Sequence, residues 1–104
     1  MRQHAEDLAD RVSWKLGLDY NARQSVRATV LSLKDYMEGK PPKTIMAVAL
    51  YWVVQLQREL SRETKAELVN RIYEACGITK STLFNNARKL DHIKSKVLPE
   101  ELLN

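Results

Sequence analysis

The stretch that decides the fold is residues 44–57, TIMAVALYWVVQLQ, which carries no charged side chain although charged residues make up 29% of the chain. A helix over this stretch has no consistently polar side, because apolar residues occur all round it: Met46, Val48, Tyr51, Val53 and Leu56. Such a helix is stable in water only when other helices surround it, and it is shorter than the ~20 apolar residues that span a bilayer. We expect a buried central helix; the alternative is a surface helix with a wide apolar stripe.

Composition favours one helical domain. A chain of 104 residues can bury most of its apolar surface in a single core. It has only three glycines and three prolines, and no stretch alternates with period two, so helices are favoured over strands. Cys76 is the only cysteine, which excludes an internal disulfide and suits a reducing compartment; we expect it to be a small buried residue. No segment resembles a signal peptide or membrane span, so we expect a soluble, intracellular all-α domain over residues 1–104.

Helical spacing predicts four more helices, at about residues 3–16, 19–38, 64–76 and 80–90. Asp19 is expected to cap the second helix, and a Thr64–Glu67 capping box is expected to start the fourth. The side chains predicted to face the core are Ala5, Leu8, Val12 and Leu16 in the first helix, Ala22, Val26, Val30, Leu33 and Met37 in the second, Leu68, Ile72 and Ala75 or Cys76 in the fourth, and Leu83, Ala87 and Leu90 in the fifth.

The chain beyond residue 90 is predicted to fold back on the body. Five apolar side chains favour this, although Pro99 interrupts them: Ile93, Val97, Leu98, Leu102 and Leu103. We refer to residues 91–104 as the basic C-terminal tail.

The fourth and fifth helices, with the short glycine turn between them, form a candidate helix-turn-helix over about residues 64–90. In that motif the first helix anchors and the second presents its outward side chains to the major groove of DNA. The outward residues, which we take as candidate DNA contacts, are Lys80, Ser81, Phe84, Asn85, Arg88 and Lys89. Any helical hairpin with a glycine turn shares this pattern, and packing is an equal alternative for Phe84.

Charge placement strengthens the DNA-binding interpretation. Residues 77–97 contain five of the 17 basic residues and one of the 13 acidic residues, which leaves twelve of each in the rest of the chain. The net charge of +4 therefore lies on the fifth helix and the segment after it, as expected for phosphate contacts. Four further lysines are candidates for phosphate or partner contacts: Lys40, Lys43, Lys94 and Lys96. The alternatives are a basic tail without a specific partner and, for Lys40 and Lys43, a solvated loop.

Two motifs resemble the cyclin-like repeats of the transcription factor IIB family. The first is GKPPKTIMAVALYWV at residues 39–53, with matches at Gly39, Lys40, Pro42, Ala47, Ala49, Leu50 and Tyr51. The second is IYEACGITKSTLFNNARKL at residues 72–90, with matches at Ile72, Gly77, Ile78, Thr82, Leu83 and Leu90. Their order and separation fit one repeat, covering about residues 7–90, and are closest to the family's second repeat.

The resemblance implies a five-helix cyclin-like domain that contacts promoter duplex DNA beside the TATA-binding protein, with RNA polymerase as a further partner. The chain departs from the family because the cysteines of its zinc ribbon and a second repeat are not in this sequence. On the fifth helix, Ser81 stands where the family has an apolar base-contacting residue, and Phe84 stands where it has arginine. Bidentate recognition of guanine is therefore not expected.

An enzyme is the least supported class. The sequence has no glycine-rich phosphate loop, no metal-binding set of His and Cys, and no catalytic carboxylate pair, so we expect no cofactor and no metal. The main alternative to DNA binding is a cyclin-fold adaptor for protein partners, in which Trp14, Tyr51 and Trp52 line a groove.

Overall fold

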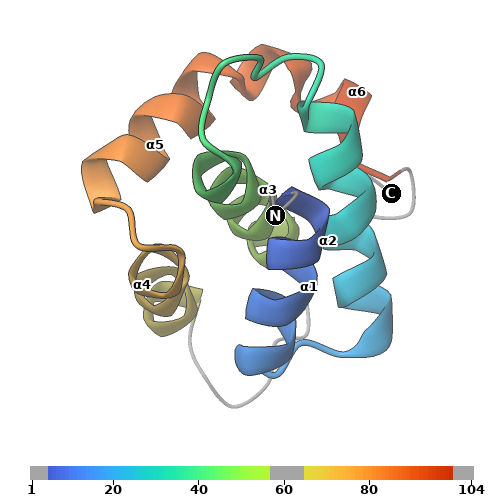
Figure 1. Cartoon of the computed structure of the whole chain (residues 1–104), viewed down its shortest axis with the longest axis vertical. Coiled ribbons are helices and arrows are strands. Elements are labelled where there is room, and N and C mark those ends of the chain that lie inside the picture. The colour runs from blue at the N-terminus through green and yellow to red at the C-terminus, as the bar shows by residue number, and fades with distance from the viewer. Residues whose placement is uncertain (1–4, 57–64, 100–104) are drawn as a thin grey trace.

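The computed structural model describes residues 5–56 and 65–99. Within these ranges the chain is helical and has no strand, which confirms the all-α class (Figure 1). The elements are α1 (Ala5–Lys15), α2 (Tyr20–Leu33), α3 (Pro42–Leu56), α4 (Lys65–Cys76), α5 (Lys80–Lys89), the 3₁₀ turn η1 (Asp91–Ile93) and α6 (Lys94–Val97). None of the helices in the two described ranges is long and apolar enough to cross a membrane.

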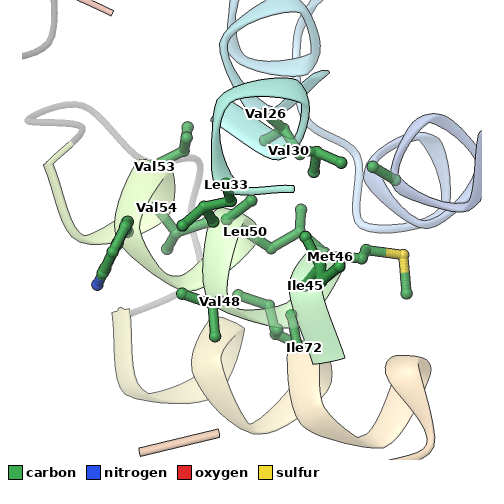
Figure 2. Packing of buried hydrophobic residues seen from close by; sticks show 14 of the residues in the cluster. Val26, Val30, Leu33, Ile45, Met46, Val48, Leu50, Val53, Val54 and Ile72 are labelled. Atoms are coloured by element: carbon green, nitrogen blue, oxygen red, sulfur yellow. The ribbon is translucent and has the colours of Figure 1, made fainter. Parts of the chain in front are cut away.

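Helix α3 is the centre of the molecule, as the uncharged stretch predicts. It packs against α1, α2, α4 and α5, and every residue from 44 to 50 and from 52 to 54 is buried. Figure 2 shows Val26, Val30 and Leu33 of α2 approaching α3 from one side while Ile72 of α4 approaches from the other. Pro42 begins the helix, a position where its missing N–H would have no partner in any case. The alternative of a surface helix is therefore wrong.

The links from α1 to α2 and from α4 to α5 end the preceding helix in the same way. Gly17 and Gly77 have φ values of 75° and 70°, in the left-handed region that glycine adopts without strain. The amide of Gly77 donates to the carbonyl of Glu74 (3.2 Å), and that of Ile78 donates to the carbonyl of Tyr73 (3.2 Å). This pair of bonds satisfies the last carbonyls of α4 in a Schellman motif.

An N-cap then starts the next helix in both links. Asp19 Oδ1 accepts from the amide of Ala22 (2.8 Å), as predicted, and Thr79 Oγ1 accepts from the amide of Thr82 (3.1 Å). Thr79 was not predicted as a cap. Both residues have extended backbone, which turns the chain sharply between the two helices. The caps fix where α2 and α5 begin.

The predicted inward faces agree closely with the structure. All five predicted residues of α2 are buried, as are Leu68, Ile72, Leu83 and Ala87, while Leu90 is partly buried. In α4 the buried alternative is Cys76, because Ala75 is exposed. In α1, Val12 and Leu16 are buried and Leu8 is partly so; Ala9 is fully buried but was not predicted.

The end of the second helix differs from the prediction. Helix α2 ends at Leu33 and not near residue 38, because the amide of Tyr36 donates to the carbonyl of Leu33 three residues earlier and tightens the chain into successive turns. These turns still bury Met37.

The tail folds back as far as it is described, with Ile93, Val97 and Leu98 buried and α6 against α2. The predicted cap at Thr64, the apolar residues Leu102 and Leu103, and the side chain of Ala5 lie outside what the structure describes.

Candidate nucleic-acid interface

One side of helix α5 packs against α3, and the opposite side faces solvent. Leu83 is fully buried and Ala87 nearly so, and both face α3. Five of the six predicted contact residues are exposed: Lys80, Ser81, Asn85, Arg88 and Lys89. We call these five residues the α5 outer face. It contains no acidic residue, and the first carboxylate after it is Asp91 in η1.

Phe84, the sixth predicted residue, lies on the flank of α5 rather than with Ser81 and Asn85. It is half-buried, and its ring meets that of Tyr51 edge to face, with 5.3 Å between centroids and 85° between planes. The ammonium of Lys80 lies 5.7 Å from the centroid of the Phe84 ring. The packing alternative for Phe84 therefore describes its contacts, and its side chain is not fully outward as those of Ser81 and Asn85 are.

A groove of about 370 Å³ opens beside Phe84, between α3, α5, η1 and the start of α6. Its lining comes from Tyr51, Trp52, Gln55, Phe84, Ala87, Arg88, Asp91 and Lys94. This volume is at the lower end of the range for small-molecule sites, large enough for one or two side chains of a partner. Arg88 belongs both to this groove and to the α5 outer face, so the two surfaces share an edge.

Lys94 is held against α3. Its ammonium donates to Gln55 Oε1 (3.1 Å) and lies 6.0 Å from the centroid of the Trp52 ring. Gln55 in turn donates through Nε2 to the hydroxyl of Tyr51 (3.3 Å). Lys94, predicted as a phosphate or partner contact, is thus a wall of the groove with a fixed position.

The other three predicted lysines are exposed but are not gathered at one place. Lys43 is in the first turn of α3, whereas Gln55 is in its last, about 18 Å along the axis at ~1.5 Å per residue. Lys40 precedes that first turn, and Lys96 lies on α6 after the groove. The structure therefore places Lys40 and Lys43 at the opposite end of α3 from the groove.

The groove residues Tyr51 and Gln55 were not predicted as a pair, although the sequence contains a signal for them. They are four residues apart on α3, and Gln55 is the exposed polar residue of an otherwise apolar run. Residues four apart on a helix lie on one side of it. The spacing of Tyr51 and Gln55 therefore indicates the side of α3 that the surrounding helices do not cover.

Metal and thiol chemistry find no support among the described residues. No group of three His, Cys, Asp or Glu side chains comes close enough there to hold a metal ion. Cys76 is buried, and burial raises the pKa of its thiol from 9.0 to about 12. A thiol protonated at neutral pH is a poor nucleophile, so Cys76 acts as a core residue, as predicted.

Comparison with models of protein families, with curated proteins and with solved structures finds no match to this chain. The resemblance to the transcription factor IIB family is therefore carried by the two sequence motifs themselves.

Proposed function

We propose that this chain is a transcription-initiation-factor-like domain that contacts promoter duplex DNA through α5. The observation that carries the proposal is the α5 outer face, where three cations and two small polar side chains are exposed together without an acid. Cations hold the phosphate backbone, and polar side chains can bond base edges in the major groove. The proposal places the chain in the compartment that holds the DNA.

The arrangement of α4 and α5 supports a helix-turn-helix. Helix α4 packs on α3 through Leu68 and Ile72, which suits an anchoring helix. The Schellman motif and the Thr79 cap then fix the start of α5 relative to α4. With α3 enclosed by α1, α2, α4 and α5, the helix order is also compatible with the five-helix cyclin-like domain that the resemblance implies.

The α5 outer face suggests a division of roles. Ser81 and Asn85 are one helical turn apart, and we assign them to base edges. Arg88 and Lys89, in the last turn, are assigned to phosphates together with Lys80 and the more distant Lys96. Phe84 is assigned a structural role, because its contact with Tyr51 holds α5 against α3.

A protein adaptor remains the second candidate, with a different surface from the one first predicted. Of the three aromatic residues predicted to line a groove, Tyr51 and Trp52 line the groove beside α5, whereas Trp14 on α1 is 70% exposed and is not part of its lining. The groove that does occur has Tyr51, Phe84, Arg88 and Lys94 around it. It favours an adaptor because aromatic residues and arginine are enriched at protein–protein interfaces.

A gel shift on promoter DNA, with and without a TATA-binding protein, tests the proposal. Arg88→Glu/Lys89→Glu should weaken the shifted band strongly, whereas Arg11→Glu/Lys15→Glu, which changes the net charge equally on the exposed side of α1, should retain it. A shift that needs the TATA-binding protein would indicate co-assembly. Loss of the shift in both variants would mean that only net charge matters, and the assignment to α5 would be wrong.

A further inference from the structure

We propose that the outer surface of α1 and α2 docks an acidic amphipathic helix of a protein partner. Four large apolar side chains stand out in solvent in the described ranges: Trp14 (70% exposed), Tyr20 (64%), Tyr36 (49%) and Leu31 (48%). All four lie on α1, on α2 or in the turns that follow α2. Exposed apolar side chains mark an interaction surface when they gather in one region of the molecule.

Three of these residues and two arginines define a surface that we call the Trp14–Leu31 strip. The guanidinium of Arg23 lies 4.5 Å from the centroid of the Trp14 ring and so joins α1 to α2. On α2, Tyr20, Arg27 and Leu31 are separated by seven and four residues, which places them on one side of the helix. From Tyr20 to Leu31 the strip runs about 17 Å, enough for three turns of a partner helix.

The charges of the strip determine the chemistry of its occupant. Helix α2 has two arginines and no acidic residue, whereas the exposed Asp10 lies one turn before Trp14 on α1. The partner's carboxylates should therefore lie over α2, between its own apolar side chains. Trp, Tyr and Arg are the residues that most often dominate protein–protein binding energy. Duplex DNA is less suited, because its phosphates would lie over Trp14 and Leu31 as well as over the arginines.

The strip and the α5 outer face can be occupied at the same time. Figure 1 shows α2 and α5 on different sides of α3, and α3 packs against both. The inference therefore goes beyond the proposed function: the domain would hold a duplex through α5 and an acidic protein segment through α2. Duplex binding by α5 and peptide binding by α2 are independent, so either proposal can be wrong while the other is correct.

Fluorescence anisotropy with a synthetic acidic peptide tests this inference. The probe is a labelled helix of about 14 residues with leucines four and three residues apart and Glu or Asp between them, and its control has Gln and Asn instead. Trp14→Ala/Leu31→Ala should weaken binding about thirtyfold, as loss of two central apolar contacts does. Arg23→Gln/Arg27→Gln should weaken it and flatten its dependence on salt. Trp14 is 70% exposed and Leu31 48% exposed, so the first variant should keep a melting temperature close to the parent's.

Duplex binding, measured in parallel, separates the two proposals. Arg88→Glu/Lys89→Glu should leave peptide binding unchanged, and the two α1–α2 variants should leave duplex binding unchanged. The inference is wrong if the acidic peptide does not bind at up to about 1 mM, or if the neutral peptide binds equally well. It is also wrong if phosphatidylserine vesicles bind through the strip and the peptide does not, or if the chain sediments as a dimer that Trp14→Ala/Leu31→Ala dissociates.

Discussion

The rings of Tyr51 on α3 and Phe84 on α5 meet edge to face, with their centroids 5.3 Å apart. This contact joins the central helix to the helix proposed to enter DNA. It lies beside the buried Leu83, so two successive side chains of α5 are held by α3. The rotation of α5 about its axis is thereby fixed, and Ser81 and Asn85 are left in solvent.

A double-mutant cycle on Tyr51→Ala and Phe84→Ala measures that contact. An edge-to-face pair contributes about 0.5–1.5 kcal/mol beyond the area it buries, so the double variant should be more stable by that amount than the sum of the single losses predicts. Urea denaturation of the parent and the three variants, at constant slope, gives the four free energies of unfolding. Strict additivity would show that the rings do not interact.

Specificity should reside in Ser81 and Asn85. Replacing both with Ala removes the polar groups that can reach base edges, so discrimination between a preferred and a random duplex should fall by about 1–3 kcal/mol for each good contact. Affinity for random duplex should change little, since the phosphate contacts remain. Competition titrations with both duplexes measure the ratio. If the ratio is unchanged, these residues do not contact bases.

Leu50→Asp should unfold the domain. Leu50 is fully buried in α3, and an unpaired carboxylate there costs several kcal/mol or must take up a proton. That cost is comparable with the ~5–15 kcal/mol that stabilises a typical domain. Leu31→Asp, at a position 48% exposed, is the matched control and should melt near the parent temperature. Equal circular dichroism and melting for both variants would contradict the central position of α3.

Cys76 should make stability depend on pH above neutrality. Because burial raises the folded pKa from 9.0 to about 12, the folded state keeps its proton where the unfolded state loses it. The contribution is intact below pH 9 and is lost at about 1.4 kcal/mol per pH unit between there and pH 12. Cys76→Ala isolates this effect from other titrating groups. Its stability should fall less than the parent's between neutral pH and about pH 10, and equal losses would contradict the burial of the thiol.

The helices and their inward faces could be predicted because they depend on short-range information. The uncharged run in α3 and the three- and four-residue spacing of Val26, Val30 and Leu33 are visible in the sequence and appear unchanged in the structure. The end of α2 was predicted less well. The predicted end near residue 38 was too late, because the turns after Leu33 depend on where the chain must meet α3, which no local pattern encodes.

The candidate site was predicted only in part, because some of its features depend on contacts between helices that are distant in sequence. The exposed cations of α5 follow from its helical period, but Phe84 lies at the edge between inward and outward sides, and its partner Tyr51 belongs to a helix distant in sequence. Which side Phe84 joins depends on how α3 and α5 cross. Arg23 and Arg27 were missed because the charge was summed over the whole remainder of the chain, where acidic residues of other segments cancel them.

The salt dependence of duplex binding tests the central claim most directly. Each phosphate contact contributes roughly 0.9 to the slope of log affinity against log salt, so Arg88→Glu/Lys89→Glu should lower the slope by about 1.8 and weaken binding to any duplex while the fold is retained. The charge-matched Arg11→Glu/Lys15→Glu variant should keep the parent slope. No binding by the parent at low salt, or an unchanged slope in the α5 variant, would contradict the assignment of α5 to DNA.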